Sequence, residues 1–138
     1  MHVANNSVFQ WGFYMSRLEA EALRKRFWEY MKTYEFHISN GMYALAVSDL
    51  EQALQLYVKA KLLDEGIAYP KTHSVRTLLE LLAKVRRDNM LMELIERYSV
   101  ELKLLEEAYI SSRYVATEFR LNEVLRVKKA LDELLKHV

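Results

Sequence analysis

Apolar residues recur at helical spacing along most of the chain. Over residues 16–38 they fall three or four positions apart and form one stripe: Leu23, Phe27, Tyr30, Met31, Tyr34 and Ile38. Ser16 is a suitable N-cap, and Glu19, three residues further on, would complete a capping box. Gly41 follows the stripe, and glycine readily adopts the left-handed conformation that ends helices. The pattern therefore predicts a first helix over 16–38.

The same spacing predicts further helices over about 42–65, 74–85, 91–109 and 117–135. The segment 42–65 is apolar around most of its circumference, which is typical of a central helix, and Gly66 closes it. Ser74 is the expected N-cap of the next helix, and the run 86–89 then interrupts the stripe. Short connections favour antiparallel neighbours. The expected fold is all-α: an up-and-down antiparallel helical bundle of four to five helices.

The first fifteen residues differ from the rest of the chain. They contain no basic stretch followed by a long apolar run, so they do not form a signal peptide. Their aromatic residues suit an N-terminal arm that docks on the bundle or on a partner, and a partly disordered leader is the alternative. We therefore expect an arm over 1–15, docked or flexible, and a bundle domain over 16–138.

Composition limits the classes of protein that fit. The chain has 138 residues, no cysteine and a net charge of +1. The absence of cysteine excludes disulfides and thiolate chemistry and suits the cytoplasm, which is the expected location. No apolar run approaches the roughly 20 residues that span a membrane. The near-neutral charge disfavours binding to extended nucleic acid. The hydrophobic fraction of 51% is high for a small domain and indicates a homodimer.

Familiar catalytic and metal-binding patterns are absent from the sequence. The histidines stand alone, without a second ligand at helical spacing, at positions 2, 37, 73 and 137. The three glycines lie too far apart to form a phosphate-binding loop, and no serine lies in a nucleophile elbow. We therefore expect no catalytic residue, no metal site and no cofactor.

The first candidate binding residues are Tyr109, Arg113 and Tyr114. Tyr109 and Arg113 are four positions apart and share a helix face, with Tyr114 adjacent. An arginine between tyrosines can hold a phosphate with its guanidinium while a ring stacks on a base. The alternative is that Arg113 pairs with Tyr109 or a carboxylate and only stabilises the bundle.

Lys59 and His73 form a second candidate group. His73 directly precedes Ser74, the expected N-cap, and free backbone N–H groups at a helix N-terminus attract phosphate oxygens. The alternative is that Thr72 or Ser74 caps the helix and His73 only packs in the connection.

Both groups lie in segments that resemble the HEPN domain (higher eukaryotes and prokaryotes nucleotide-binding). The similarity covers about residues 16 to 137. It lies in Asp49-Leu50-Glu51-Gln52-Ala53, Lys59-Ala60-x-Leu62-Leu63, Gly66, Pro70-x-Thr72-His73-Ser74-Val75 and Tyr109-Ile110-x-x-Arg113-Tyr114. Five such segments in register make the resemblance fairly specific.

The resemblance implies a dimeric helical bundle, often encoded beside a small nucleotidyltransferase, and some such pairs act as toxin–antitoxin systems. It leads us to expect a non-catalytic module of the nucleotidyltransferase-associated type, which binds a nucleotide or RNA or partners a nucleotidyltransferase. The alternative is a purely structural dimeric subunit without a nucleotide site.

The sequence departs from the pattern of the family's ribonucleases, which use an arginine followed by histidine after four to six residues. No arginine of this chain has histidine at that spacing, and Arg113 is followed there by Glu118, Phe119 and Arg120. Val115 also replaces the proline that often follows Arg-Tyr. Because the histidine would serve as general acid or base, a metal-independent ribonuclease is the less favoured interpretation.

Overall fold

The computed structural model describes the backbone of residues 2–114 and 118–138 and the side chains of residues 12, 15–110 and 118–138. Within these ranges the chain forms six helices and no strand. They are α1 (His2–Ser39), α2 (Tyr43–Asp64), α3 (Val75–Arg86), α4 (Asn89–Arg97), α5 (Ser99–Tyr114) and α6 (Leu121–His137). The all-α prediction is confirmed, and the predicted number of helices, four to five, was too low.

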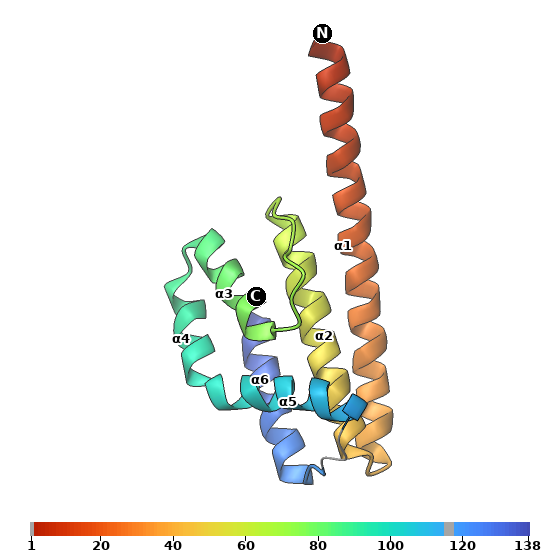
Figure 1. Ribbon diagram of the computed structural model, residues 1–138, viewed down its shortest axis with the longest axis vertical. Coiled ribbons are helices and arrows are strands. Elements are labelled where there is room, and N and C mark those ends of the chain that lie inside the picture. The colour runs from red at the N-terminus through yellow and green to blue at the C-terminus, as the bar shows by residue number, and fades with distance from the viewer. Residues whose placement is uncertain (1, 115–117) are drawn as a thin grey trace.

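The additional helix results from a bend at Tyr98, which divides the helix predicted over 91–109 into α4 and α5. Tyr98 has a ψ of 23°, although its amide still donates to the Leu94 carbonyl and its carbonyl still accepts from the Leu102 amide. Apolar residues keep their three-and-four spacing across the bend, so the pattern does not reveal it. The bend directs α5 across the long axes of α1 and α2 (Figure 1), and the bundle is therefore not purely up-and-down.

Helices α1 and α2 lie side by side and antiparallel (Figure 1). Gly41, with a φ of 71°, lies in the turn between them, as predicted. The start of α1 was predicted wrongly: the helix begins at His2, so Ser16 lies inside it and caps nothing. The extended helix projects beyond the C-terminal end of α2 (Figure 1). The aromatic side chains of the predicted arm lie outside those that the structure describes.

Helix α2 is the centre of the bundle, as its all-round apolar pattern predicts. It contacts α1, α3, α5 and α6. Its largest fully buried side chains are Leu50, Leu54 and Leu62. One side of the helix remains open, because Leu45 is 47% exposed. None of the helices in the described ranges is both long and apolar enough to cross a membrane.

The predicted helix ends around α3 are confirmed. The Ser74 side chain accepts a hydrogen bond from the Thr77 amide at 3.1 Å, which makes Ser74 the N-cap of α3. Gly66 has a φ of 77°, which glycine adopts without strain after the end of α2. Asp88 caps α4 in the same way as Ser74 caps α3, by accepting from the Leu91 amide at 2.9 Å.

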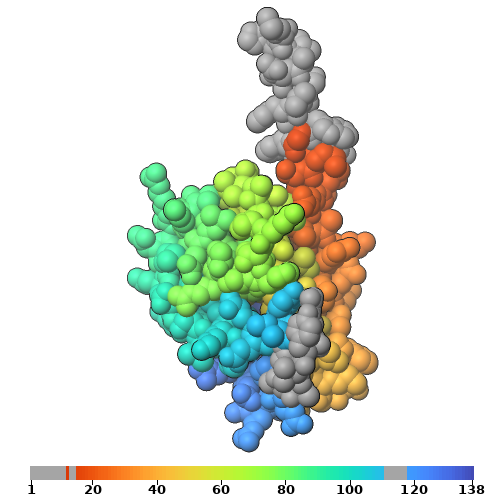
Figure 2. All heavy atoms as spheres, viewed as in Figure 1, coloured from red at the N-terminus to blue at the C-terminus, as the bar shows by residue number. Residues whose placement is uncertain are grey.

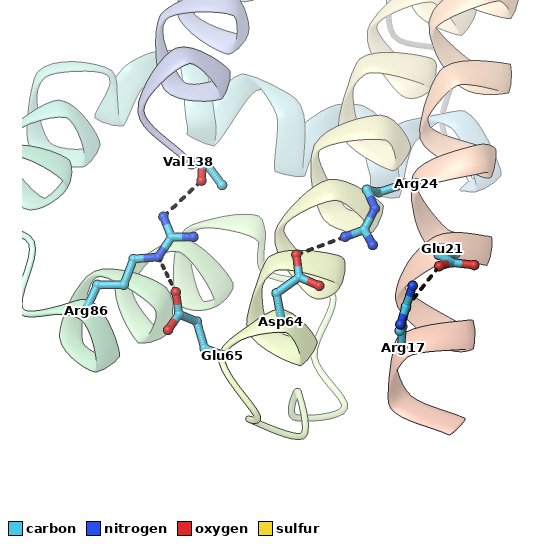
Figure 3. Close-up of polar contacts among 7 residues, drawn as sticks. All are labelled: Arg17, Glu21, Arg24, Asp64, Glu65, Arg86 and Val138. Atoms are coloured by element: carbon cyan, nitrogen blue, oxygen red, sulfur yellow. Dashed lines mark hydrogen bonds and ion pairs between the residues drawn. The ribbon is translucent and has the colours of Figure 1, made fainter. Parts of the chain in front are cut away.

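Arginine side chains connect α1, α2, α3 and the C-terminus at one end of the bundle (Figure 3). Arg86 donates to the Glu65 carboxylate and to the Val138 carbonyl, both at 2.9 Å, and so joins α3, the end of α2 and the C-terminus. Arg24 of α1 donates to Asp64 of α2 at 2.9 Å. Each such partly exposed pair contributes up to about 1 kcal/mol.

Candidate functional site

The connection between α2 and α3, residues 65–74, brings two candidate residues together. It leads to the start of α3, which lies beside α5 (Figure 1), and on this face the green residues of the connection and α3 meet the cyan residues of α5 (Figure 2). There the His73 ring stacks on the Tyr109 ring, with centroids 4.8 Å apart and planes inclined by 23°. His73 is exposed and Tyr109 is half-buried. The two segments singled out in the sequence therefore meet in one stack.

Hydrogen bonds hold the connection in place at His73. The buried Gln55 of α2 donates from Nε2 to the His73 carbonyl at 3.1 Å. The Ser74 amide donates to the Thr72 hydroxyl, also at 3.1 Å. The backbone on both sides of the His73 ring is thus fixed to α2 and to the connection itself, which positions the ring for the stack.

Glu51 lies behind this connection as a fully buried carboxylate. Gln55 and Gln52 donate to its two oxygens from their Nε2 atoms, and Glu51 has further interactions besides these. A buried carboxylate needs such donors, because an unpaired charge inside a protein is costly. Glu51 belongs to one of the segments that carry the family resemblance, but it was not among the predicted site residues. Its place between Val47 and Leu54 on the buried face of α2 was the signal that could have found it.

Glu106 lies beside the N-terminus of α3, where one interpretation of the sequence predicts a contact with a phosphate. The Ser74 hydroxyl donates to Glu106 Oε1 at 2.8 Å. A phosphate there would meet a carboxylate, and like charges repel. The structure thus makes this N-terminus a poor phosphate site. Glu106 was not among the predicted residues, although it precedes Tyr109 by three positions and shares its helix face.

The Lys59 side chain of α2 contacts the same connection at Tyr69. Its ammonium group lies 5.1 Å from the centre of the Tyr69 ring, and it forms no ion pair with a carboxylate of the described residues. The Tyr69 hydroxyl donates to Glu19 of α1 at 2.6 Å, and this bond, with burial and the charge of Glu19, raises the pKa of Tyr69 to about 12. Lys59 follows Gln55 by one helical turn, so its ammonium group stays close to the segment that carries His73.

Arg113 and Tyr114 belong to the last turn of α5, and their side chains lie outside those that the structure describes. Arg113 follows Tyr109 by four positions, which is the spacing on which the predicted phosphate clamp rests. The phosphate clamp at Arg113 and Tyr114 therefore remains a prediction.

A second polar pair, also missed from the sequence, lies away from the stack. His37 Nδ1 and Asp49 Oδ2 are 2.5 Å apart between α1 and α2. Burial raises the pKa of Asp49, and the neighbouring His37 offsets the rise only in part. The pair alone is too small a donor set for a metal ion. Among the described residues no three His, Cys, Asp or Glu side chains come together as a metal site.

Comparison with known proteins identifies the family of this chain. The family model described as "HEPN domain" matches residues 20–138. A search of curated proteins and a search of solved structures each found no match. The matched region begins within α1 and includes α2, the connection with His73, and α5. Because the match covers most of the chain, the protein belongs to the HEPN domain family.

Proposed function

We propose that this HEPN domain is a non-catalytic module that binds a nucleotide or the end of an RNA. The binding face would be formed by α2, the connection 65–74 and α5. The observation that carries the proposal is the stack of His73 on Tyr109. Proteins commonly bind unpaired bases on aromatic side chains, and each such stack contributes about 1–3 kcal/mol. The exposed His73 ring offers a base an open surface next to a ring that already supports it.

Cationic groups on the proposed binding face suit the phosphate of such a ligand. Lys59 of α2 has no carboxylate partner among the described residues, and its ammonium group lies over Tyr69, which belongs to the same connection as His73. Arg113 would supply a guanidinium group one helical turn beyond Tyr109, as the sequence predicts. Two cations suit a mononucleotide or a chain end better than extended RNA, which agrees with the net charge of +1.

The test is calorimetric titration with ATP, GMP and short RNA, on protein whose oligomeric state is fixed by light scattering. We expect saturable binding that falls about tenfold in His73→Ala and in Arg113→Ala, because each removes a base or phosphate contact. His137→Ala serves as a matched control, since this exposed histidine at the end of α6 lies in no candidate group. Absence of binding up to millimolar ligand would refute the proposal.

The partners expected from the sequence also enter as proposals. A homodimer is supported by large apolar side chains that the bundle leaves exposed, such as Phe36 at 60% and Leu45 at 47%. These residues also support the alternative function, a structural dimeric subunit without a nucleotide site. A dimer in light scattering that binds no nucleotide would favour this alternative.

A separate nucleotidyltransferase subunit, in a toxin–antitoxin-type pair, is the second proposed partner. It follows from the family rather than from a contact in the structure. Co-expression with a nucleotidyltransferase encoded beside this protein, followed by size-exclusion chromatography, tests it. Separate elution of the two proteins would contradict the pairing.

A further inference from the structure

We infer that the proposed nucleotide site selects guanine, through the carboxylate of Glu106. The inference rests on the proposed function, since it concerns the base that would stack on His73. Glu106 and Tyr109 lie three positions apart on one face of α5, and Ser74 directly follows His73. The bond between Ser74 and Glu106 and the stack of His73 on Tyr109 are therefore adjacent contacts between the same two segments. A base on the His73 ring would have one edge near the Glu106 carboxylate.

This carboxylate has hydrogen-bonding capacity to spare. Its Oε1 atom accepts one bond, from the Ser74 hydroxyl, and a carboxylate oxygen can accept a second. Its Oε2 atom accepts no hydrogen bond from any residue that the structure describes. Arg76 of α3 interacts with Glu106 through its charge, but it donates its hydrogen bonds to Glu80 and Glu96 instead. Glu106 is thus held in position by Ser74 while both of its oxygens remain able to bind a donor.

The Glu106 carboxylate can be reached from the surface. It borders a surface hollow of about 390 Å³ between the start of α3 and α5, which Arg76, Val100 and Lys103 also line and which does not extend to His73 or Tyr109. The carboxylate is half-buried, so a ligand can reach it while part of the surrounding water is excluded. Partial exclusion of water strengthens a charge-assisted hydrogen bond relative to one made in bulk water.

The bases differ in what they offer a carboxylate. The Watson–Crick edge of guanine has two neighbouring donors, the N1–H and the 2-amino group, which match the two oxygens of a carboxylate. Adenine and cytosine each offer one amino group next to an acceptor nitrogen, and uracil offers one N–H between two carbonyl groups. These acceptors would face the negative charge and be repelled. Guanine alone forms two hydrogen bonds with Glu106, and a bidentate contact typically discriminates by about 1–3 kcal/mol, or about 5- to 150-fold.

The experiment compares GMP, IMP, AMP, CMP and UMP as ligands of the full chain by calorimetry. We expect GMP to bind at least about tenfold more tightly than AMP, CMP and UMP. IMP keeps the N1–H but lacks the 2-amino group, so its affinity should be intermediate. This ranking is measured on the unaltered protein and does not depend on how any variant folds.

The variant Glu106→Gln then tests whether Glu106 causes the preference for guanine. The amide still accepts from the Ser74 hydroxyl but loses the charge and one acceptor, so GMP affinity should fall about tenfold. AMP affinity should not fall, because the acceptor nitrogen of adenine no longer faces a negative charge. Glu107→Gln is the matched control, because this neighbouring acid is exposed and lies on a different face of α5. It should keep the full guanine preference.

The outcomes separate the two proposals. Binding of all five nucleotides with equal affinity, or a guanine preference that survives Glu106→Gln, would overturn the guanine inference and leave nucleotide binding standing. Absence of binding by every nucleotide and by short RNA would overturn the proposed function and the guanine inference with it.

Discussion

The buried hydrogen bonds of Gln55 make a prediction that can be worked out in detail. Gln55 is 5% exposed and donates from its single amide nitrogen to the Glu51 carboxylate and to the His73 carbonyl. Gln55→Leu keeps a side chain of similar size but removes both donors. Gln55 is buried together with the Glu51 carboxylate, so water does not reach the place of the lost donor. His73 is exposed, and water can replace the bond to its carbonyl.

The expected loss follows from these two bonds. A hydrogen bond to a charged group contributes about 1.5–3 kcal/mol and a neutral one about 0.5–1.5 kcal/mol. With the second bond partly replaced by water, we expect Gln55→Leu to lower the free energy of unfolding by about 2–3 kcal/mol. For a chain of 138 residues the average unfolding entropy converts this into a fall in Tm of about 7–10 °C.

Gln52→Leu provides a closely matched control. Gln52 lies on the same helix and donates to the other oxygen of the same carboxylate at 2.9 Å, but it is half-buried. Water can reach its position, so we expect a loss below about 1 kcal/mol. Urea unfolding of both variants, with unchanged m values, measures the difference. Because Gln55 also holds the connection at His73, nucleotide affinity should fall in Gln55→Leu and not in Gln52→Leu.

Two results would refute this reasoning. Equal losses in the two variants would mean that burial of the donor does not set the size of the effect. No loss in Gln55→Leu would mean that the other interactions of Glu51 already satisfy its carboxylate.

Three further predictions concern the rest of the fold. Burial raises the pKa of Asp49 in the folded protein above its ordinary value of 3.8. The folded protein therefore binds this proton more tightly than the unfolded chain does, and the resulting stabilisation is lost as the pH rises through the raised pKa. Asp49→Asn keeps an acceptor for His37, so its urea midpoint relative to the unaltered protein should rise as the pH is raised above about 4, and a flat difference would contradict this. Asp88→Ala removes the N-cap of α4 and should cost about 1 kcal/mol in thermal unfolding, whereas an unchanged Tm would show that the cap is not needed. Leu54→Ala leaves a cavity in the core and should cost about 3–5 kcal/mol in urea unfolding, and a loss below about 1 kcal/mol would mean that the core closes around it.

Much of the fold was predictable because its signals are local. The apolar faces of α2 and α3, the left-handed glycine after α2 and the N-cap at Ser74 all depend on residues within one or two turns of each other. The bend at Tyr98 was not predictable, because the apolar spacing and the backbone hydrogen bonds both continue across it. The start of α1 at His2 was missed for a related reason: Ser16 and Glu19 suit a cap, but nothing local requires the helix to begin there.

The candidate site was predicted as separate residues and assembled only in three dimensions. The sequence marked His73 and Tyr109, whose residue types suit base or phosphate binding, but not that their rings stack. It also placed Lys59 in the second candidate group without the contact to the Tyr69 ring. Glu106 was passed over, because a glutamate on a helix becomes distinctive only when another segment supplies Ser74 to its carboxylate.

By itself, the sequence determined the helical class, the central place of α2, the N-cap of α3 at Ser74 and the resemblance to the HEPN family, since each depends on residue order or short-range spacing. Only the tertiary structure decided which polar groups meet: His73 with Tyr109, and Ser74 with Glu106. The members of these pairs are more than thirty positions apart. Whether they touch depends on how α5 turns at Tyr98 and crosses the end of the connection. The packing of all the apolar helix faces together sets that geometry, and no short stretch of sequence contains it.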